Sequence, residues 1–214
     1  MLFFLSRALM LFLPLFLTAC KHSDHDVSSG PTVATTSGSV SAAFGPEGSV
    51  IYRDIGYAIP PSDIRRWRAP ATLSAPEQII SPFADPVMCP QPQSMTSGGV
   101  AGEYLGTEDC LYLDVYAPNP ADVSDPLPVM LWIHGGSNLT GHKGTYDFSR
   151  LAARQRVIVV VINYRLGPFG WFVHPALNGP DLDSPPVANF GTLDMIEALR
   201  WTQKNIGGFG GDPA

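Results

Sequence analysis

The chain has 214 residues, of which 45% are hydrophobic and 15% charged, with 21 glycines and 21 prolines. The hydrophobic fraction is large enough to form a buried core, which excludes a wholly disordered chain. A formal net charge of −6 argues against nucleic acid as a partner, because nucleic-acid binding needs a clustered basic face. Frequent prolines exclude a coiled coil or a helical repeat, so the composition leaves a loop-rich α/β or all-β globular protein.

Residues 1–19 are predicted to be a signal peptide. They are mostly apolar, with one positive charge at Arg7, and the apolar core ends at Leu17. This core is shorter than the roughly 20 residues that a membrane-spanning helix needs, and it is typical of a signal peptide. The residues from Leu17 to Cys20 (L-T-A-C) resemble the lipobox of bacterial lipoproteins, which implies acylation of the Cys20 thiol. The alternative is an ordinary secretory signal followed by an incidental cysteine.

The lipobox implies an exported protein held on a membrane by the lipid at Cys20. Lys21, rather than Asp, follows this cysteine. By the usual sorting pattern of bacterial lipoproteins, this residue implies the outer membrane.

Residues 20–37 are predicted to be a flexible tether. They are small, polar or charged and show no apolar periodicity, so they bury too little surface to offset the entropy of ordering. Their histidines and aspartates at 22–26 are interpreted as a solvated polar run rather than a metal site. No metal or cofactor is expected in this chain.

Cys89 and Cys110 are predicted to form a disulfide. With Cys20 acylated, they are the two remaining cysteines of a chain exported to an oxidising compartment. The loop between them is rich in proline and glycine, so a covalent link would constrain it where little else does.

The domain is predicted to begin at residue 38, where short β-prone runs replace the polar segment. Runs over residues 40–44, 49–52 and 55–59 predict a small antiparallel sheet. Further along the chain, residues 111–116 are predicted to form another strand.

Strands are also predicted over residues 128–134 and 157–164, both buried on two faces because they are almost entirely apolar. Helices are predicted over 151–155 and 189–206. The second helix is expected to bury its apolar side, which comprises Met195, Ile196, Leu199, Thr202 and Ile206. Such strands alternating with helices predict an α/β fold with a parallel or mixed sheet covered on both faces.

The tetrapeptide His134-Gly135-Gly136-Ser137 directly follows the predicted strand 128–134. Two glycines allow the backbone to approach a ligand closely, and successive N–H groups in such a turn form a site for negative charge. An oxyanion hole requires this geometry. Taken alone the triplet H-G-G is a weak signal, because any tight turn after a strand has the same composition.

A series of motifs in the same order resembles the type B carboxylesterases, the cholinesterase-like branch of the α/β-hydrolases. The most specific is E-D-C-L-Y-L-D-V at 108–115, similar to the family's E-D-C-L-Y-L-N-V. The other matching segments are R-W-R-A-P at 66–70, W-I-H-G-G at 132–136, N-Y-R-L-G at 163–167, N-F-G-T-L-D at 189–194 and N-I-G-G-F-G-G-D-P at 205–213. The resemblance covers residues 38–214, which are identified as a partial carboxylesterase type B domain.

The resemblance implies the N-terminal part of an α/β-hydrolase fold, with a mixed central sheet flanked by helices and a small N-terminal antiparallel sheet. It implies hydrolysis of a small-molecule carboxylic ester. In the family the oxyanion donors match the N–H groups of Gly136 and Ser137, while His134 and Gly135 open the turn and His134 has a structural role. The family usually carries Gly or Ala and then an aromatic residue where this chain has Ser137-Asn138, which implies a different acyl pocket.

The family's nucleophile motif G-x-S-x-G does not occur in the 214 residues. The serine, the acidic residue and the histidine of the triad lie further downstream in the family. The fold is therefore expected to stop before the nucleophile elbow, and the chain alone is expected to be inactive as an esterase.

Three other roles follow from the resemblance. Arg66 and Glu108 match a structural ion pair that anchors the disulfide loop. Asp114 stands where the family usually has Asn, and it is expected to face solvent or a turn. The cholinesterases carry a tryptophan in the disulfide loop that stacks on choline. This chain has none between Cys89 and Cys110, so a neutral ester is favoured.

Three interpretations remain open at this point. The chain is part of a carboxylesterase, a catalytically inactive hydrolase-like protein used for binding or adhesion, or a non-functional truncation product. Coding DNA that continues beyond the Ala214 codon into a G-E-S-A-G segment would support the first.

Overall fold

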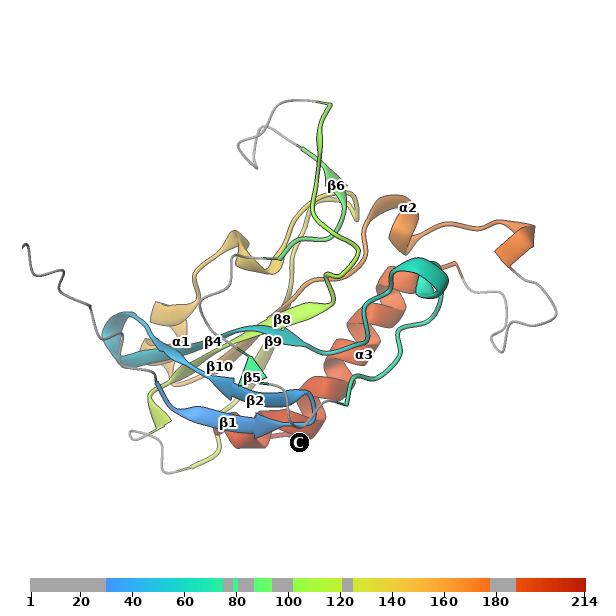
Figure 1. Ribbon diagram of the computed structural model, residues 1–214. Coiled ribbons are helices and arrows are strands. Elements are labelled where there is room, and N and C mark those ends of the chain that lie inside the picture. The colour runs from blue at the N-terminus through green and yellow to red at the C-terminus, as the bar shows by residue number, and fades with distance from the viewer. Residues whose placement is uncertain (1–29, 75–78, 81–86, 94–101, 121–124, 178–187) are drawn as a thin grey trace, which may run out of the picture.

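The structure is a computed structural model that describes residues 30–74, 79–80, 87–93, 102–120, 125–177 and 188–214. A mixed sheet of five strands lies at its centre (Figure 1). In sheet order the strands are β3 (Ala43–Phe44), β4 (Ser49–Gly56), β8 (Tyr112–Pro118), β10 (Ile158–Ile162) and β9 (Val129–Ile133). Within this sheet β10 and β9 pair in parallel, and the other neighbours are antiparallel. The mixed central sheet is therefore confirmed.

Smaller elements surround the central sheet. A three-stranded sheet contains β1 (Thr32–Thr35), β2 (Gly38–Ser41) and β5 (Ile79–Ile80), and a hairpin joins β6 (Gln91–Pro92) to β7 (Tyr104–Leu105). The α-helices are α1 (Ser149–Gln155), α2 (Gly167–Gly170) and α3 (Phe190–Asn205). The 3-10 turns are η1 (Pro46–Gly48), η2 (Asp63–Arg65), η5 (Lys143–Thr145), η6 (Pro175–Leu177) and η7 (Ile206–Phe209). Among the described residues, no helix is long and apolar enough to cross a membrane.

The strand β10 is buried on both faces, as predicted. Successive side chains of a strand point to opposite faces of its sheet. Ile158, Val160 and Ile162 belong to the core that contains Trp201 of α3. The alternate residues Val159 and Val161 belong to a second core with Ala152 of α1. Helices α3 and α1 thus cover opposite faces of the sheet.

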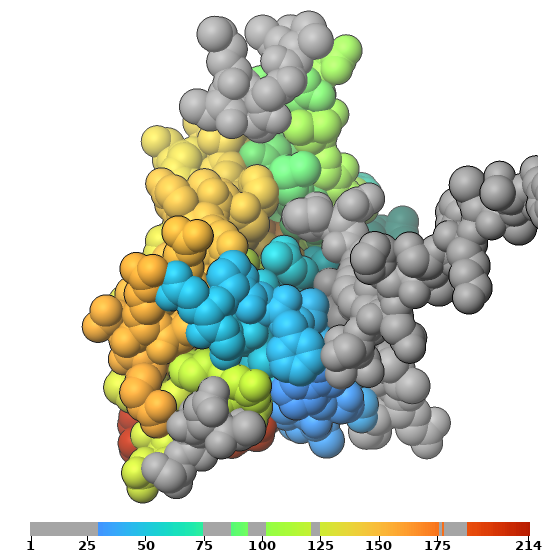
Figure 2. Space-filling view, turned by 90° about the vertical axis from the view of Figure 1, so that its left-hand side faces the viewer, coloured from blue at the N-terminus to red at the C-terminus, as the bar shows by residue number. Residues whose placement is uncertain are grey.

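Helix α1 packs over the N-terminal part of the central sheet. Figure 2 shows cyan N-terminal residues directly against the orange segment that follows residue 150. At this contact Arg154 Nη2 donates to Glu47 Oε1 at 2.6 Å. The long side chains bridge η1 and α1 at the surface, so they contribute little to stability compared with the apolar core beneath them.

The prediction that both apolar strands are buried on two faces is wrong for β9. In the described residues β9 pairs with β10 on one side and stands at the end of the sheet order. Met130 is 52% exposed and Ile133 is 42% exposed. Strand β10 lies between β8 and β9. Apolar composition does not distinguish an interior strand from one whose outer neighbour lies elsewhere.

The ordered domain begins earlier than residue 38, because residues 32–35 of the predicted tether form β1. This strand pairs antiparallel with β2, and Val33 lies opposite Val40. Beyond the strand, Thr36 N donates to Asn205 Oδ1 at 2.8 Å, and Trp201 Nε1 donates to Ser37 Oγ at 2.8 Å. The composition of this segment is polar because its partners are polar groups of α3. The rest of the predicted tether, residues 20–29, lies outside the described residues.

The N-terminal β-prone runs also assemble differently from the prediction. Residues 49–56 form the single strand β4 of the central sheet, with a register shift between Tyr52 and Ile55. The small sheet instead consists of β1, β2 and β5, and β5 pairs with β2 in parallel. Its β1–β2 hairpin is the antiparallel part.

Helix α3 is present almost as predicted, but the predicted buried side is only partly correct. Thr202 and Ile206 are buried and Met195 packs against the core. Ile196 and Leu199, on the expected apolar side, are 38% and 49% exposed. The buried residues are Phe190, Gly191, Asp194, Glu197, Ala198, Trp201, Thr202 and Asn205. The polar members of this face bind groups on distant segments, for example Thr72 Oγ1, which donates to Glu197 Oε1 at 2.7 Å. A hydrophobicity pattern does not reveal such partners.

We expect Asn205→Ala to lower the free energy of unfolding by about 1–3 kcal/mol, because it removes the hydrogen bonds between the buried Asn205 amide and Thr36. Asn205 also donates to Thr36 Oγ1 at 3.0 Å. Gln203→Ala, at an exposed position of the same helix, is the matched control and should change the value little. Urea denaturation of the three proteins provides the measurement. Equal stability of all three would show that the N-terminal segment does not dock on α3.

Candidate active site

The residues after β9 form a tight left-handed turn. Gly136 has a φ of 112°, and Ser137 and Asn138 have φ values of 56° and 60°. Leu139 N and Thr140 N both donate to Gly136 O, at 3.0 and 3.1 Å. A Cβ at residue 136 would overlap the carbonyl oxygen of Thr140, so only glycine fits there. The second glycine of the motif is therefore required by the turn itself.

The N–H groups of Gly136 and Ser137 are available to a ligand. Neither donates a hydrogen bond to any described residue, and both residues are exposed. Gly136 lines a hollow of about 440 Å³. Its lining comprises Gln91, Trp132, Gly135, Gly136, Thr140, Gly141, His142, Gly144, Thr145 and Tyr146. Successive N–H groups in such a turn stabilise an anion, including the oxyanion formed during acyl transfer.

His134 supports the turn rather than offering a base. It is 3% exposed, and its ring stacks on Tyr164 with 4.4 Å between the centroids. Its Nδ1 lies 2.9 Å from Gly135 O. Because a carbonyl oxygen only accepts hydrogen bonds, Nδ1 is the protonated nitrogen. Tyr164 Oη donates to His134 O at 3.0 Å. Burial lowers the pKa of His134, so the imidazole is neutral and enclosed.

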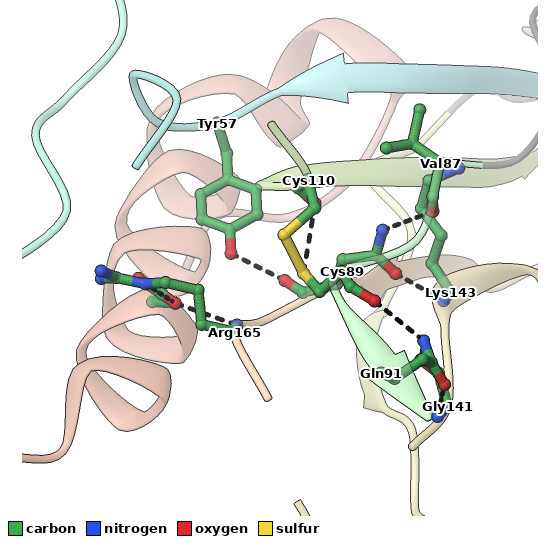
Figure 3. Close-up of a disulfide and its surroundings, with 10 residues drawn as sticks. Tyr57, Val87, Cys89, Gln91, Cys110, Gly141, Lys143 and Arg165 are labelled. Carbon is green, nitrogen blue, oxygen red and sulfur yellow. Dashed lines mark hydrogen bonds and ion pairs between the residues drawn. A yellow bond between two sulfur atoms is a disulfide. The ribbon is translucent and has the colours of Figure 1, made fainter. Parts of the chain in front are cut away.

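The predicted disulfide is present between Cys89 and Cys110, with 5.0 Å between their Cα atoms (Figure 3). The predicted ion pair lies beside this loop. Arg66 Nε donates to Glu108 Oε2 at 2.6 Å, and Arg66 Nη2 pairs with Glu108 Oε1. A bidentate pair of this kind fixes the direction of Glu108, two residues before the second cysteine.

Asp114 was expected to face solvent or a turn, and this expectation is wrong. Its side chain is fully buried, and Lys143 Nζ donates to its Oδ1 at 2.6 Å. Lys143 also pairs with Asp54 Oδ1 at 2.7 Å, while Asp54 N donates to Asp114 Oδ1 at 2.8 Å. We call Asp54, Asp114 and Lys143 the buried triad. Burial raises the pKa of Asp114, and the nearby ammonium of Lys143 opposes this rise.

A second buried ion pair lies beneath the segment after β10. Arg165 Nε and Nη2 donate to the two carboxylate oxygens of Asp194 at 2.8 and 2.7 Å. Both side chains are buried, and burial raises the pKa of Asp194 while Arg165 opposes the rise. These residues join the loop after β10 to α3. No three His, Cys, Asp or Glu side chains of the described residues are grouped as metal ligands.

Nothing in the sequence marks Gln91 or Lys143 as part of this site. Gln91 contacts Gly141, 50 residues away, and Lys143 contacts Asp114, 29 residues away. The single sequence signal for the buried cluster was Asp114, which stands where the family usually has asparagine. An extra buried carboxylate requires a nearby cation.

The chain matches known esterases over nearly all of its described length. A model of the carboxylesterase family matches residues 29–214. Para-nitrobenzyl esterase of Bacillus subtilis is 42% identical over 164 residues, which span 76% of this chain and 32% of that protein. Liver carboxylesterase 1 of Oryctolagus cuniculus is 35% identical over 212 residues, which span 92% of this chain and 36% of that protein. The chain thus spans about a third of the length of these relatives.

Solved structures agree with this match. A PNB esterase structure superposes with a TM-score of 0.73 at 39% identity, covering 85% of this chain and 36% of the other. EstA of Aspergillus niger superposes with a TM-score of 0.71 at 27% identity, covering 86% of this chain and 34% of the other. These matches confirm the predicted α/β-hydrolase fold, of which this chain spans a part.

The buried triad gives a test with a built-in control. Lys143→Met leaves two carboxylates without a cation, and we expect it to lower the free energy of unfolding at pH 7 by about 3–5 kcal/mol. Asp114→Asn keeps an oxygen for Lys143 and Asp54 N and leaves one carboxylate for one ammonium, so we expect a change within about 1 kcal/mol. Urea denaturation distinguishes the two, and equal losses would contradict this assignment of charges.

Asp114→Asn should also change how the free energy of unfolding depends on pH. Because the pKa of Asp114 is raised on folding, its contribution to stability is complete below the ordinary aspartate pKa and is lost as the pH rises through the folded value. Asp114→Asn should therefore remove a component of stability that falls with rising pH.

Proposed function

Because this chain belongs to the carboxylesterase family, we propose that its residues form the N-terminal portion of a carboxylic ester hydrolase. The observation that carries the proposal is the glycine turn after β9, where the N–H groups of Gly136 and Ser137 donate to no described residue. In the proposed reaction a serine outside these 214 residues attacks the ester carbonyl. The two N–H groups then stabilise the negative charge on the carbonyl oxygen.

The open edge of β9 supports the proposal that this chain supplies the oxyanion donors and that the serine comes from outside these residues. Leu127, just before β9, forms an isolated parallel bridge with Gly211. Leu127 N donates to Gly210 O at 2.9 Å, and Asp212 N donates to Leu127 O at 2.8 Å. The last residues therefore run beside the start of β9 and in the same direction. A strand continuing along this line would pair with β9 and end beside the turn that begins at His134.

The substrate we propose is a neutral carboxylic ester. The segment between Cys89 and Cys110 contains no tryptophan to stack on a quaternary ammonium, and Tyr104, its one aromatic residue, is 78% exposed. The names of relatives refer to ester hydrolysis, as in para-nitrobenzyl esterase and liver carboxylesterase 1. The Ser137-Asn138 pair after Gly136 gives this chain an acyl pocket different from the family's usual one.

The proposed location is the outer membrane, with export followed by acylation of Cys20. The support is the L-T-A-C sequence that ends at Cys20, the apolar segment before it, and Lys21 after it. The Cys89–Cys110 disulfide fits this route, because such bonds form in oxidising compartments.

We expect this chain and a complementary fragment to hydrolyse p-nitrophenyl acetate together, although neither does so alone. The fragment is the part of Bacillus subtilis para-nitrobenzyl esterase that follows the segment matched by this chain. Gly136→Ala should lower kcat of the assembled enzyme about 100-fold, because the side chain moves the turn and its donors. Gly48→Ala is the matched control, since Gly48 has a φ of 73° and open space around its Cα.

Two outcomes of this experiment would contradict the proposal. Turnover and fluorophosphonate labelling of the 214-residue chain alone would place the nucleophile within it. Stable assembly of the two pieces without turnover would favour the binding role instead.

We expect Cys20→Ala to abolish incorporation of radiolabelled palmitate and to release the protein from the membrane fraction. The mechanism is the loss of the thiol that carries the lipid. Lys21→Asp, the control at the neighbouring position, should keep the label but move the protein to the inner membrane. Labelling that survives Cys20→Ala, or a precursor whose size is unaffected by globomycin, would rule out a lipoprotein.

A further inference from the structure

Gln91 joins two segments that lie far apart in the chain. Its Nε2 donates to Gly141 O at 2.9 Å, and its Oε1 accepts from Gly141 N at 2.7 Å (Figure 3). The same Nε2 donates to Cys89 O at 3.1 Å. Gln91 is 5% exposed, so these bonds form away from bulk water. One amide side chain therefore satisfies both backbone groups of Gly141 and returns to the disulfide-bonded cysteine.

Gly141 lies directly against the start of the oxyanion turn. Its φ is 117°, and a Cβ there would overlap the ring of His134 and the carbonyl oxygen of Gly135. The residue is thus packed against the two residues that lead into the donors Gly136 and Ser137. A displacement of Gly141 would require His134 and Gly135 to move as well.

A second bridge connects the same two segments through Asn163, the residue after β10. Asn163 Nδ2 donates to Val87 O at 2.7 Å, and its Oδ1 accepts from Lys143 N at 2.8 Å. Residues 87–91 are therefore joined to residues 141–143 at both ends, directly through Gln91 and indirectly through Asn163. The disulfide connects this assembly covalently to the sheet, because Cys110 is two residues before the start of β8.

We propose that Gln91 is a positioning residue that holds the oxyanion turn in place from the disulfide loop. The Cys89–Cys110 bond then orients the turn through this side chain. Although Gln91 lines the hollow, the role proposed for it is exerted through its bonds to Gly141. The catalytic consequence rests on the proposed function, whereas the mechanical link between the two loops does not.

The link is tested on the full chain by amide hydrogen exchange. In Gln91→Met, which keeps the volume but removes the amide, exchange of the Gly141 N–H should accelerate about 5- to 10-fold, the factor expected from one typical hydrogen bond. Exchange in α3 should stay unchanged. Gln155→Met, at the exposed end of α1, is the matched control and should alter neither region.

The disulfide is tested in the same way with Cys89→Ser/Cys110→Ser, which should accelerate exchange over residues 134–141 in the same direction. Unchanged exchange at Gly141 in Gln91→Met would overturn the proposal. Equal acceleration in α3 would also overturn it, since the side chain would then act only on global stability.

The catalytic consequence is tested in the enzyme assembled with the complementary fragment. Gln91→Met should lower kcat about 10-fold or more through misplacement of the donors. The KM should stay within about twofold, because ground-state binding does not use the oxyanion contacts. A change confined to KM would overturn the positioning role. If the unsubstituted assembly shows no turnover, the proposed function fails, and the exchange measurement still decides the link between the loops.

Discussion

The parallel pairing of β9 with β10 is the constraint on which the rest of this site depends. The register places Ile133 beside Ile162, so both strands end at the same edge of the sheet. The residues that follow the two strands therefore lie close together, and the ring of His134 stacks on the ring of Tyr164. The turn that carries Gly136 is built on that contact. Without this register the glycine turn would not be held in one orientation relative to the sheet.

Buried polar groups hold the surroundings of this turn. The triad of Asp54, Asp114 and Lys143 lies under one side of it, and the Gln91 amide lies on another. Burying such groups costs free energy unless each is paired, so they add little net stability. They do restrict the loops to one arrangement, because each hydrogen bond is made in a single geometry. The site is thus oriented by polar contacts on a scaffold stabilised by apolar burial.

Several large apolar side chains are exposed beside this scaffold. Met130 and Ile133 on β9 lie at the open edge, and Ile196 and Leu199 are exposed on α3. A groove of about 390 Å³ lies between Val129, α3 and the last residues of the chain. Unpaired apolar sheet edges of this kind promote aggregation unless another strand covers them. This edge favours aggregation of the isolated chain. In the proposed enzyme, a further strand would pair at the same edge and end near the glycine turn.

Local sequence patterns were enough to predict the core strands β8, β9 and β10, helices α1 and α3, the disulfide partners and the glycine turn, because these features depend on apolar periodicity, cysteine count or backbone freedom. They did not identify which strand stands at the edge of the described sheet, since apolar composition is the same for an interior strand and for an edge strand. They also did not determine the buried face of α3 or the place of Asp114. Those depend on Asn205, Lys143 and other polar partners that only the tertiary structure brings together, and pairing across long sequence separations leaves no local pattern.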